Sequence, residues 1–413
     1  MRLFITLVAS TLVLDAGAAR SETWPRFRGP HGDGQCEAAG IPSKWTEEDY
    51  LWTVPLAGLG HSSPVVWNER VFVTTADPQM AEQTLLCVDA VTGKELWHKS
   101  FAGGPHAMHA TNSYATSTPT VDESQVYMAW KVGDAVHLAA WKHDGEPAWT
   151  KEIAHLAEHH GFGTSPIVVG DVVCMTNETE ATADSAVLGC DRLTGDERWR
   201  VPRAAGKTTY ATPYLWQPPH GKPLLLSAGM GSGLTAIDPA SGAVAWTSLE
   251  HDLPDRCVSS PIVAGGLALV SCGSGNNGLH LIAVRPGDDG GAPQQEVYRI
   301  KKGVPNIPTP LVYGELLFLW HDRGTVSCVD LATGAPHWLK RIEGKFHSSP
   351  IRIGERIFGT SLSGEVIVLA ASKEFQELAR NDLGDPCTAT PAVADGRVYF
   401  RTEKRLLCLG AKK

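Results

Sequence analysis

The stretch Thr309–Ile342, TPLVYGELLFLWHDRGTVSCVDLATGAPHWLKRI, divides into four short apolar runs separated by turn residues. The runs are Pro310–Tyr313, Leu316–Trp320, Thr325–Leu331 and His337–Ile342. Because the runs are brief and rich in Val, Leu and aromatic residues, they favour strands over helices. Connections as short as Gly314-Glu315 make neighbouring strands pair antiparallel. The stretch therefore predicts a four-stranded β-meander.

This unit recurs along the chain, and each copy opens with a Ser/Thr-Pro step. The prolines of these steps are Pro64, Pro119, Pro166, Pro213, Pro261, Pro310, Pro350 and Pro391. Their spacing of about 40 to 55 residues is typical of propellers and solenoids. A second mark, Asp-x-x-Thr/Ser-Gly-x-x-x-Trp, occurs at Asp89–Trp97, Asp191–Trp199, Asp238–Trp246 and Asp330–Trp338, and in shortened form at His143–Trp149. Glycine suits a tight turn and tryptophan can pack between adjacent sheets, so this mark indicates a structural role.

The eighth copy is incomplete, and this decides the architecture. After Pro391 it offers only the runs Arg397–Arg401 and Arg405–Leu409 before the chain ends. Leu51–Pro55 resembles the fourth strands of other copies, yet it precedes the first Ser-Pro step. If it completes the last sheet, the ring closes and leaves no unfinished blade. We expect an all-β fold, a single eight-bladed β-propeller of four-stranded antiparallel blades spanning residues 50–413.

The N-terminal residues 1–19 are typical of a secretory signal peptide. Arg2 supplies a positive start, Leu3–Leu14 is a short apolar core, and Ala16-Gly17-Ala18 offers small residues for cleavage. The apolar run is too short to cross a membrane comfortably, and no cysteine lies near the cleavage region to carry a lipid. We expect a periplasmic or secreted monomer without a transmembrane span after cleavage.

Residues 20–49 form a leader ahead of the closing strand. It contains aromatics and proline without strand alternation, so we expect ordered coil packed on the ring, with Trp24 and Phe27 tucked against it. The net charge of the whole chain is −9 and no long basic run occurs. The sequence therefore gives no support for a nucleic-acid partner.

The nine cysteines are scattered, with no CxxC and no adjacent pair. Cys174 with Cys190, and Cys257 with Cys272, are expected on neighbouring strands of one blade. Each pair could form a disulfide if the register brings the two Cα atoms within about 7 Å. The alternative is that these residues are small buried hydrophobes.

The meander geometry sorts the loops onto two faces of the ring. Short turns such as Gly170-Asp171 and Gly354-Glu355 share one face. The other face carries the long segments Gly103–Thr116, Ile153–Thr164, Asn177–Ser185, Arg203–Ala211 and Gly273–Leu279. Long loops on a rigid scaffold tend to carry function, so a site is expected on this second face.

Polar residues leading into the Ser/Thr-Pro steps are predicted to converge on the central opening of this face. They are His61, Asn112, Tyr114, His160, Lys207, Tyr210, Arg256, Asn306, Lys345 and His347. Such a mouth could hold an anionic or polar small molecule. The alternative is a water-filled funnel whose polar groups cap the inner strands.

The sequence contains only weak patterns for a metal site or for catalytic residues. The spacings of His106 with His109, and of His155 with His159, could bring imidazoles to one metal. Zinc needs a third or fourth ligand, which the sequence does not indicate. Because the carboxylates mostly mark turns, no acid–base pair stands out. We therefore predict no metal site and no catalytic residue.

The repeated Asp-x-x-Thr-Gly-x-x-x-Trp segments resemble the tryptophan-docking motifs of the pyrroloquinoline-quinone-like (PQQ-like) β-propellers. That superfamily includes quinoprotein alcohol dehydrogenases and the propeller lipoprotein of the outer-membrane β-barrel assembly machinery. The leader WPRFRGPHGDG at Trp24–Gly34, and the segment His109–Ala115, resemble marks of exported planctomycete-type propellers. The resemblance covers essentially the whole mature chain and implies the fold, while one scaffold of this kind hosts unrelated activities.

The sequence also departs from that superfamily. Quinoprotein dehydrogenases hold their quinone against a vicinal Cys-Cys disulfide beside a calcium ion, with an aspartate as base, and this chain has no adjacent cysteines. It also lacks the acylated N-terminal cysteine of the assembly lipoprotein. Two hypotheses remain. The favoured one is a non-catalytic envelope scaffold that binds a protein or another envelope component. The alternative is a PQQ- and calcium-dependent dehydrogenase, or a binder of a small anion that uses Arg256, Lys207 and Lys345.

Overall fold

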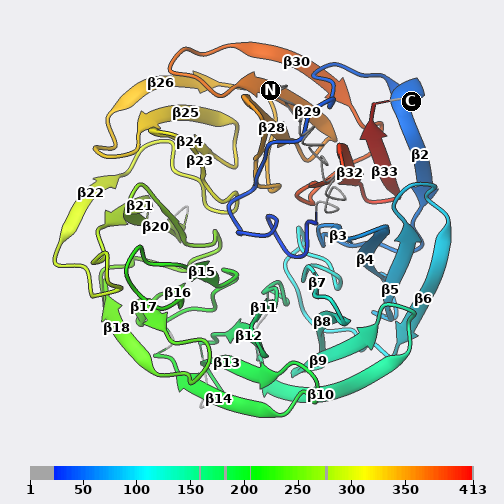
Figure 1. Cartoon of the computed structure of the whole chain (residues 1–413), viewed down its shortest axis with the longest axis horizontal. Helices are drawn as coiled ribbons and strands as arrows, with labels where there is room; N and C mark the ends of the chain where they lie inside the picture. The colour runs from blue at the N-terminus through cyan, green and yellow to red at the C-terminus, as the bar shows by residue number, and fades with distance from the viewer. Residues whose placement is uncertain (1–22, 158–159, 181–183, 205, 275–277, 412–413) are drawn as a thin grey trace, which may run out of the picture.

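The computed structural model describes residues 23–157, 160–180, 184–204, 206–274 and 278–411. Eight sheets are arranged around one axis, so the chain forms an eight-bladed β-propeller (Figure 1). The predicted fold is confirmed. The predicted signal peptide lies outside the described residues.

The first four blades each contain four consecutive strands, numbered from the axis outward. Blade 1 is β3 (Val65–Trp67), β4 (Arg70–Ala76), β5 (Gln83–Asp89) and β6 (Glu95–Phe101). Blade 2 is β7 (Thr120–Val121), β8 (Gln125–Val132), β9 (Ala135–Lys142) and β10 (Pro147–His155). Blade 3 is β11 (Ile167–Val169), β12 (Val172–Asn177), β13 (Ala186–Asp191) and β14 (Glu197–Pro202). Blade 4 is β15 (Tyr214–Trp216), β16 (Leu224–Gly229), β17 (Gly233–Ile237) and β18 (Val244–Ser248).

The next three blades repeat this order, and the last one is completed from the other end of the chain. Blade 5 is β19 (Ile262–Ala264), β20 (Leu267–Ser274), β21 (Gly278–Val284) and β22 (Glu296–Ile300). Blade 6 is β23 (Leu311–Tyr313), β24 (Leu316–Trp320), β25 (Thr325–Asp330) and β26 (Pro336–Arg341). Blade 7 is β27 (Ile351–Ile353), β28 (Arg356–Thr360), β29 (Glu365–Ala370) and β30 (Glu377–Asp382). Blade 8 is β31 (Ala392–Ala394), β32 (Arg397–Arg401) and β33 (Arg405–Gly410), with β2 (Tyr50–Pro55) as its outer strand.

The pairing of β2 with β33 closes the ring. The two strands run antiparallel, with Thr53 opposite Leu407 and Val54 opposite Leu406. In Figure 1 the blue β2 lies beside the red β33, which confirms the predicted closure by the segment around Leu51–Pro55.

The leader crosses the middle of the ring as the dark blue segment of Figure 1. It departs from coil in two places, the short strand β1 (Gln35–Cys36) and the 3-10 helix η1 (Glu47–Asp49). β1 pairs in parallel with the innermost strand of blade 7, placing Gln35 opposite Arg352. Trp24 is 1% exposed and exchanges backbone hydrogen bonds with Val66 of blade 1. The leader is thus part of the folded ring.

Tryptophans on the outer strands of six blades join each of them to the next blade. Trp149 of blade 2, for example, donates its indole N–H to the carbonyl of Arg192 at 2.9 Å in the turn of blade 3. The same bond is made by Trp52, Trp97, Trp199, Trp246 and Trp338. In blade 5 the hydroxyl of Tyr298 takes this role by donating to the carbonyl of Leu331. The predicted packing of tryptophan between sheets is confirmed.

The turn glycines allow this contact because a side chain would collide with the indole. Gly195 has φ +75°, and a Cβ added there would lie 2.4 Å from the Trp149 ring. Asp191 holds the same turn by accepting the backbone N–H groups of Leu193 and Thr194. The aspartate, glycine and tryptophan of the repeat therefore form one joint between neighbouring blades.

The nine cysteines are all free thiols, so neither proposed disulfide forms. Cys174 lies on β12 and Cys190 on β13, as expected, with Cys174 opposite Gly189. Cys257 was expected on a strand but lies in the segment before β19, because the inner strand of blade 5 begins only at Ile262. Burial raises the pKa of the Cys190 thiol to about 12, which makes it chemically inert.

We expect Gly195→Ala to destabilise the fold more than Gly170→Ala. Both glycines have positive φ, but a Cβ at Gly170 meets nothing within 4 Å. Both variants carry the same backbone strain of about 1 to 2 kcal/mol. The additional loss of unfolding free energy in Gly195→Ala therefore measures the collision with the indole ring. Overpacking of this kind costs about 1 to 3 kcal/mol. Urea unfolding of the two variants measures the difference, and equal losses would contradict the blade-to-blade joint.

Candidate functional site

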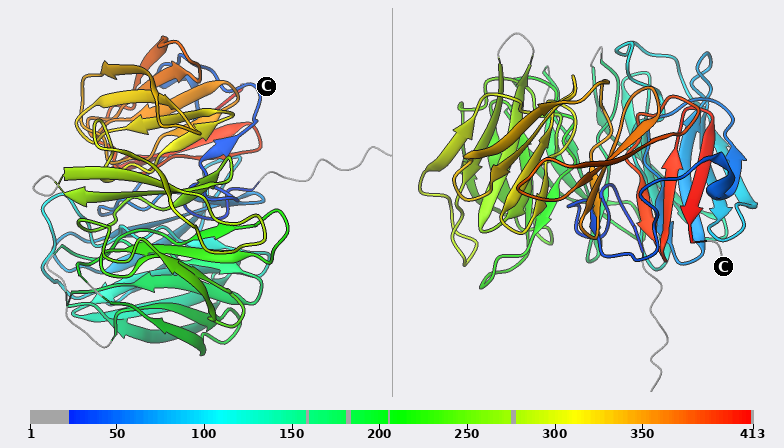
Figure 2. Two further views of the ribbon diagram at one scale, coloured as in Figure 1. Left: turned by 90° about the vertical axis from the view of Figure 1, so that its left-hand side faces the viewer. Right: turned by 90° about the horizontal axis from the view of Figure 1, so that it is seen from above.

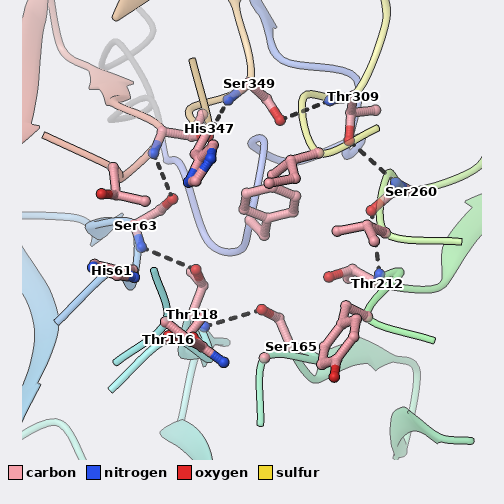
Figure 3. Close-up of a pocket in the computed structure, with 18 of the residues that line it drawn as sticks. His61, Ser63, Thr116, Thr118, Ser165, Thr212, Ser260, Thr309, His347 and Ser349 are labelled. Carbon is pink, nitrogen blue, oxygen red and sulfur yellow. Dashed lines mark hydrogen bonds between the residues drawn. The ribbon is translucent and has the colours of Figure 1, made fainter. Parts of the chain in front are cut away.

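A belt of Ser and Thr residues surrounds the axis at the Ser/Thr-Pro steps (Figure 3). Seven of the eight donate their backbone N–H to the hydroxyl oxygen of the counterpart in the next blade, at 3.0–3.2 Å. The bonded pairs are Ser63 to Thr118, Thr118 to Ser165, Thr212 to Ser260, Ser260 to Thr309, Thr309 to Ser349, Ser349 to Thr390 and Thr390 to Ser63. The belt ties the inner strands together and crosses the junction between blades 8 and 1.

The leader closes the axial channel at the end that carries the short turns. Figure 2 shows the dark blue leader at the lower side of the ring. Arg28 is 1% exposed and donates to the carbonyls of Pro310 and Pro350 at 3.0 Å, and to that of Asp33 at 2.7 Å. Burial lowers its pKa to about 10. Phe27, held beside it, lines the channel cavity, so the channel is a pocket with a floor.

The channel cavity has a volume of about 310 Å³ and opens towards the long-loop face. The hydroxyl belt surrounds it above Phe27. Its rim is formed by residues that lead into the Ser/Thr-Pro steps, including His61, His109, Asn112, His160, Tyr210, Arg256, Asn306 and His347. A cavity of this size suits a small ligand. The described residues that line it include no Asp or Glu.

The structure brings together seven of the ten residues predicted at the mouth. His61, Asn112, His160, Tyr210, Arg256, Asn306 and His347 line the channel cavity. Tyr114 lines a second cavity beside it. Lys207 and Lys345 line neither of these two cavities, and Lys345 is exposed to solvent. The three cations proposed as charge partners of an anion therefore do not converge.

A buried carboxylate balances two of those cations. Asp255 has no exposed side-chain surface and accepts hydrogen bonds from Lys207 Nζ at 3.2 Å and from Ser274 Oγ at 2.7 Å. The guanidinium of Arg256 lies 3.8 Å from the other oxygen of Asp255 and 3.9 Å from Glu180. Arg256 thus faces the channel with carboxylates already close to it.

The imidazoles at the mouth belong to different environments. His109 and His160 stack with ring centroids 5.9 Å apart and planes 6° from parallel. His61 is partly buried, and this burial, together with the nearby charge of Arg401, lowers its pKa to about 3. Burial also lowers the pKa of His347. His61 is therefore neutral at physiological pH.

The proposed histidine pairs do not form a metal centre within the described part of the chain. His109 lines the channel, whereas His106 packs edge-on against Tyr114. His155 faces Asp184 and Glu152 on the exposed surface, and His159 lies outside the described residues. Among the described residues, no group of three or more His, Cys, Asp or Glu side chains is placed to hold a metal ion.

Sequence reasoning missed two parts of the site, the hydroxyl belt and the Phe27 floor. The belt has a signal in the sequence, because all eight copies place Ser or Thr directly before the proline. The floor has none, since the position of Phe27 depends on Arg28 reaching carbonyls of Thr309, Pro310 and Pro350, hundreds of residues away.

The family model described as "Outer membrane protein assembly factor BamB" matches residues 46–216 and 217–374. The chain belongs to this family of PQQ-like β-propellers. A comparison with curated proteins gives no match. None of the helices within the described residues has the length and apolar character needed to cross a membrane.

Solved structures with the same fold include proteins of different kinds. BamB from Moraxella catarrhalis is 16% identical with a TM-score of 0.62, covering 88% of this chain and 97% of that one. The computationally designed Ika8 protein is 12% identical with a TM-score of 0.59, covering 88% and 99%. Quinohemoprotein alcohol dehydrogenase from Comamonas testosteroni is 13% identical with a TM-score of 0.51, covering 96% and 81%. At these identities the likeness concerns the fold alone.

We expect the unfolding free energy of His61→Gln to decrease less on acidification than that of the wild type. The unfolded imidazole binds a proton near pH 6.5, whereas the folded one does so only near pH 3, so folding stability falls as pH drops between these values. Removing one such group reduces the slope by at most about 1.4 kcal/mol per pH unit. Urea unfolding at several pH values measures it, with the same change at exposed His337 as control. An unchanged slope in His61→Gln would contradict the burial of a neutral imidazole.

Proposed function

We propose that this chain is an exported, non-catalytic binding protein of the cell envelope, which presents its long-loop face to a protein partner. The observation that carries the proposal is the difference between the two faces. The leader covers the short-turn face and closes the channel there, while the other face carries the long loops and the opening of the cavity. Membership of the BamB family supports a role in protein binding.

The longest described loop of that face is held in place by its own contacts. The Asn112 side-chain amide donates to the carbonyl of His160 at 2.7 Å, which links the blade 1 loop to the next crossing. Gln83 donates to the carbonyl of Tyr114 at 2.7 Å, and Ser113 Oγ lies 3.0 Å from Thr116 Oγ1. A preformed surface loses less conformational entropy on binding, which favours recognition of a partner.

The quinone-dependent alternative finds little support in the lining of the channel. A calcium ion prefers several oxygen ligands, carboxylates among them, and the described lining offers hydroxyls, amides and imidazoles without a carboxylate. All nine cysteines are free thiols, Cys36 half-buried and the other eight buried. No two of them are adjacent in the sequence. These residues do not fit a calcium-bound quinone, so the binding role is preferred.

Shortening Gly103–Thr116 is expected to abolish partner binding while the propeller stays folded. No strand lies within this loop, so shortening it removes binding surface and leaves the strand ladders of the blades intact. Native mass spectrometry of protein purified from its own envelope compares the associated chains in the wild type and the variant. Lys94→Glu, on the opposite face, is the control and should keep the partner. A partner retained by the shortened protein would contradict the assignment of the face.

Mixing the purified protein with PQQ and calcium is expected to give no visible-range spectrum of a bound cofactor and no calorimetric heat. The physical reason is the lack of acidic ligands among the described residues of the channel lining. Calcium-dependent, saturable heat of binding at high micromolar quinone would contradict this prediction and support the dehydrogenase hypothesis.

A further inference from the structure

The hydroxyl belt around the channel is interrupted at one place among the described residues, between blades 3 and 4. The backbone N–H of Ser165 does not donate to the hydroxyl of Thr212, as the missing dashed line between them in Figure 3 shows. Thr212 is 6% exposed and lines the channel cavity. Within the described chain its Oγ1 has no hydrogen-bond partner, yet it is not sealed from the cavity as the unpartnered atoms of Arg401 are. This hydroxyl therefore keeps both its donor and its acceptor for a ligand in the channel.

The interruption lies next to Arg256. Tyr210, two residues before Thr212, donates its backbone N–H to the carbonyl of Cys257 at 2.9 Å. This bond holds the segments that carry Thr212 and Arg256 side by side, and both residues line the same cavity. Arg256 keeps 16% of its side-chain surface exposed, and it is the only Arg or Lys among the described residues of the lining. A cation that is accessible from the channel thus neighbours the unpartnered hydroxyl.

The N–H groups of this guanidinium are not taken up by the carboxylates beside it. The closest oxygens of Asp255 and Glu180 are 3.8 and 3.9 Å away, which is beyond hydrogen-bond length. Asp255 instead accepts Lys207 Nζ, Ser274 Oγ and the backbone N–H of Arg256. No described residue accepts a hydrogen bond from the Arg256 side chain. Its fork of donors therefore remains available to a group in the channel, and a carboxylate matches that fork.

The rest of the described lining suits hydroxyl groups carried on a ring. Seven hydroxyls of the belt each accept one backbone N–H, and no described residue accepts the hydrogen that each of them keeps. Phe27, Val258 and Ile307 add apolar surface to the same cavity. No Asp or Glu of the described lining would repel an anion. A ligand with one carboxylate, several hydroxyls and an apolar ring face matches this combination.

We propose that the channel binds a hexuronic acid, a pyranose sugar that carries one carboxylate. The carboxylate pairs with the guanidinium of Arg256, a ring hydroxyl exchanges hydrogen bonds with Thr212, and the C–H face of the ring packs on Phe27. A cavity of about 310 Å³ has room for one sugar ring. This site lies inside the channel and does not depend on the protein partner proposed above.

Calorimetric titration of the purified protein with matched probes tests the proposal. D-Glucuronate and D-galacturonate carry the carboxylate, their parent sugars D-glucose and D-galactose lack it, and cyclohexanecarboxylate lacks the hydroxyls. At least one of the two hexuronates is expected to bind about tenfold more tightly than its parent sugar and than cyclohexanecarboxylate. No binding of either hexuronate at about 10 mM, or equal affinity for all the probes, would overturn the proposal.

Replacing the guanidinium tests the carboxylate contact. In Arg256→Gln the preference for the hexuronate over its parent sugar should fall to about one, because the charge-assisted pair is lost. Lys345→Gln makes the same change in net charge at an exposed residue that does not line the channel, and should leave the preference unchanged. A preference that persists in Arg256→Gln, or that disappears in Lys345→Gln, would overturn the proposal.

Thr212→Val is an independent test should Arg256→Gln fail to fold. The hydroxyl of Thr212 has no partner among the described residues, so its removal should leave the midpoint of urea unfolding nearly unchanged. The affinity for the hexuronate should fall about three- to tenfold, as expected for one lost hydrogen bond. Thr53→Val, at an exposed position of the outer strand β2, is the control. Unchanged affinity in Thr212→Val, or the same loss in Thr53→Val, would contradict binding at this place in the channel.

Discussion

Closure of the ring is the constraint on which the other features depend. A blade of this kind cannot bury both of its faces alone, so each sheet is stable only between two neighbours. The last blade receives its outer strand from β2, and the pairing of Thr53 with Leu407 joins the two ends of the chain. At the axis the bond from Thr390 to Ser63 crosses the same junction. The first and last blades are therefore joined at the rim and at the centre.

Closure also determines what the channel can do. Seven hydroxyl oxygens of the belt accept backbone N–H groups, and each of these hydroxyls keeps its hydrogen to donate. The described lining of the channel offers hydroxyl, amide and imidazole groups, while Asp255 is fully buried beside Lys207 and Arg256. A chain of net charge −9 thus surrounds a channel whose described lining has no acidic side chain. Because the leader closes one end, any exchange with solvent takes place on the long-loop face.

The elements set by local pattern were predictable from the sequence, and those set by distant contacts were not. Leu316–Trp320 and Arg397–Arg401 match the observed strands residue for residue, because alternation and turn chemistry act over a few residues. The loops that converge on the mouth followed from the meander topology. The topology did not determine the direction in which each loop side chain points. Lys207, for example, faces Asp255, which is 48 residues away in the sequence. Cys257 was placed on a strand because sequence alone did not show how late β19 begins.

Two buried arginines, Arg28 and Arg401, have similar burial and similar pKa values but different hydrogen-bond partners. Arg28 and Arg401 are each 1% exposed, and burial lowers the pKa of both to about 10. Arg28 is surrounded by carbonyl oxygens that accept its N–H groups, so backbone dipoles stabilise its charge without a carboxylate. Arg401 is buried to the same extent, but its Nε and Nη2 find no acceptor among the described residues. The difference between the two arginines is therefore one of hydrogen bonding, because backbone carbonyls accept the N–H groups of Arg28 and leave the Nε and Nη2 of Arg401 without an acceptor among the described residues.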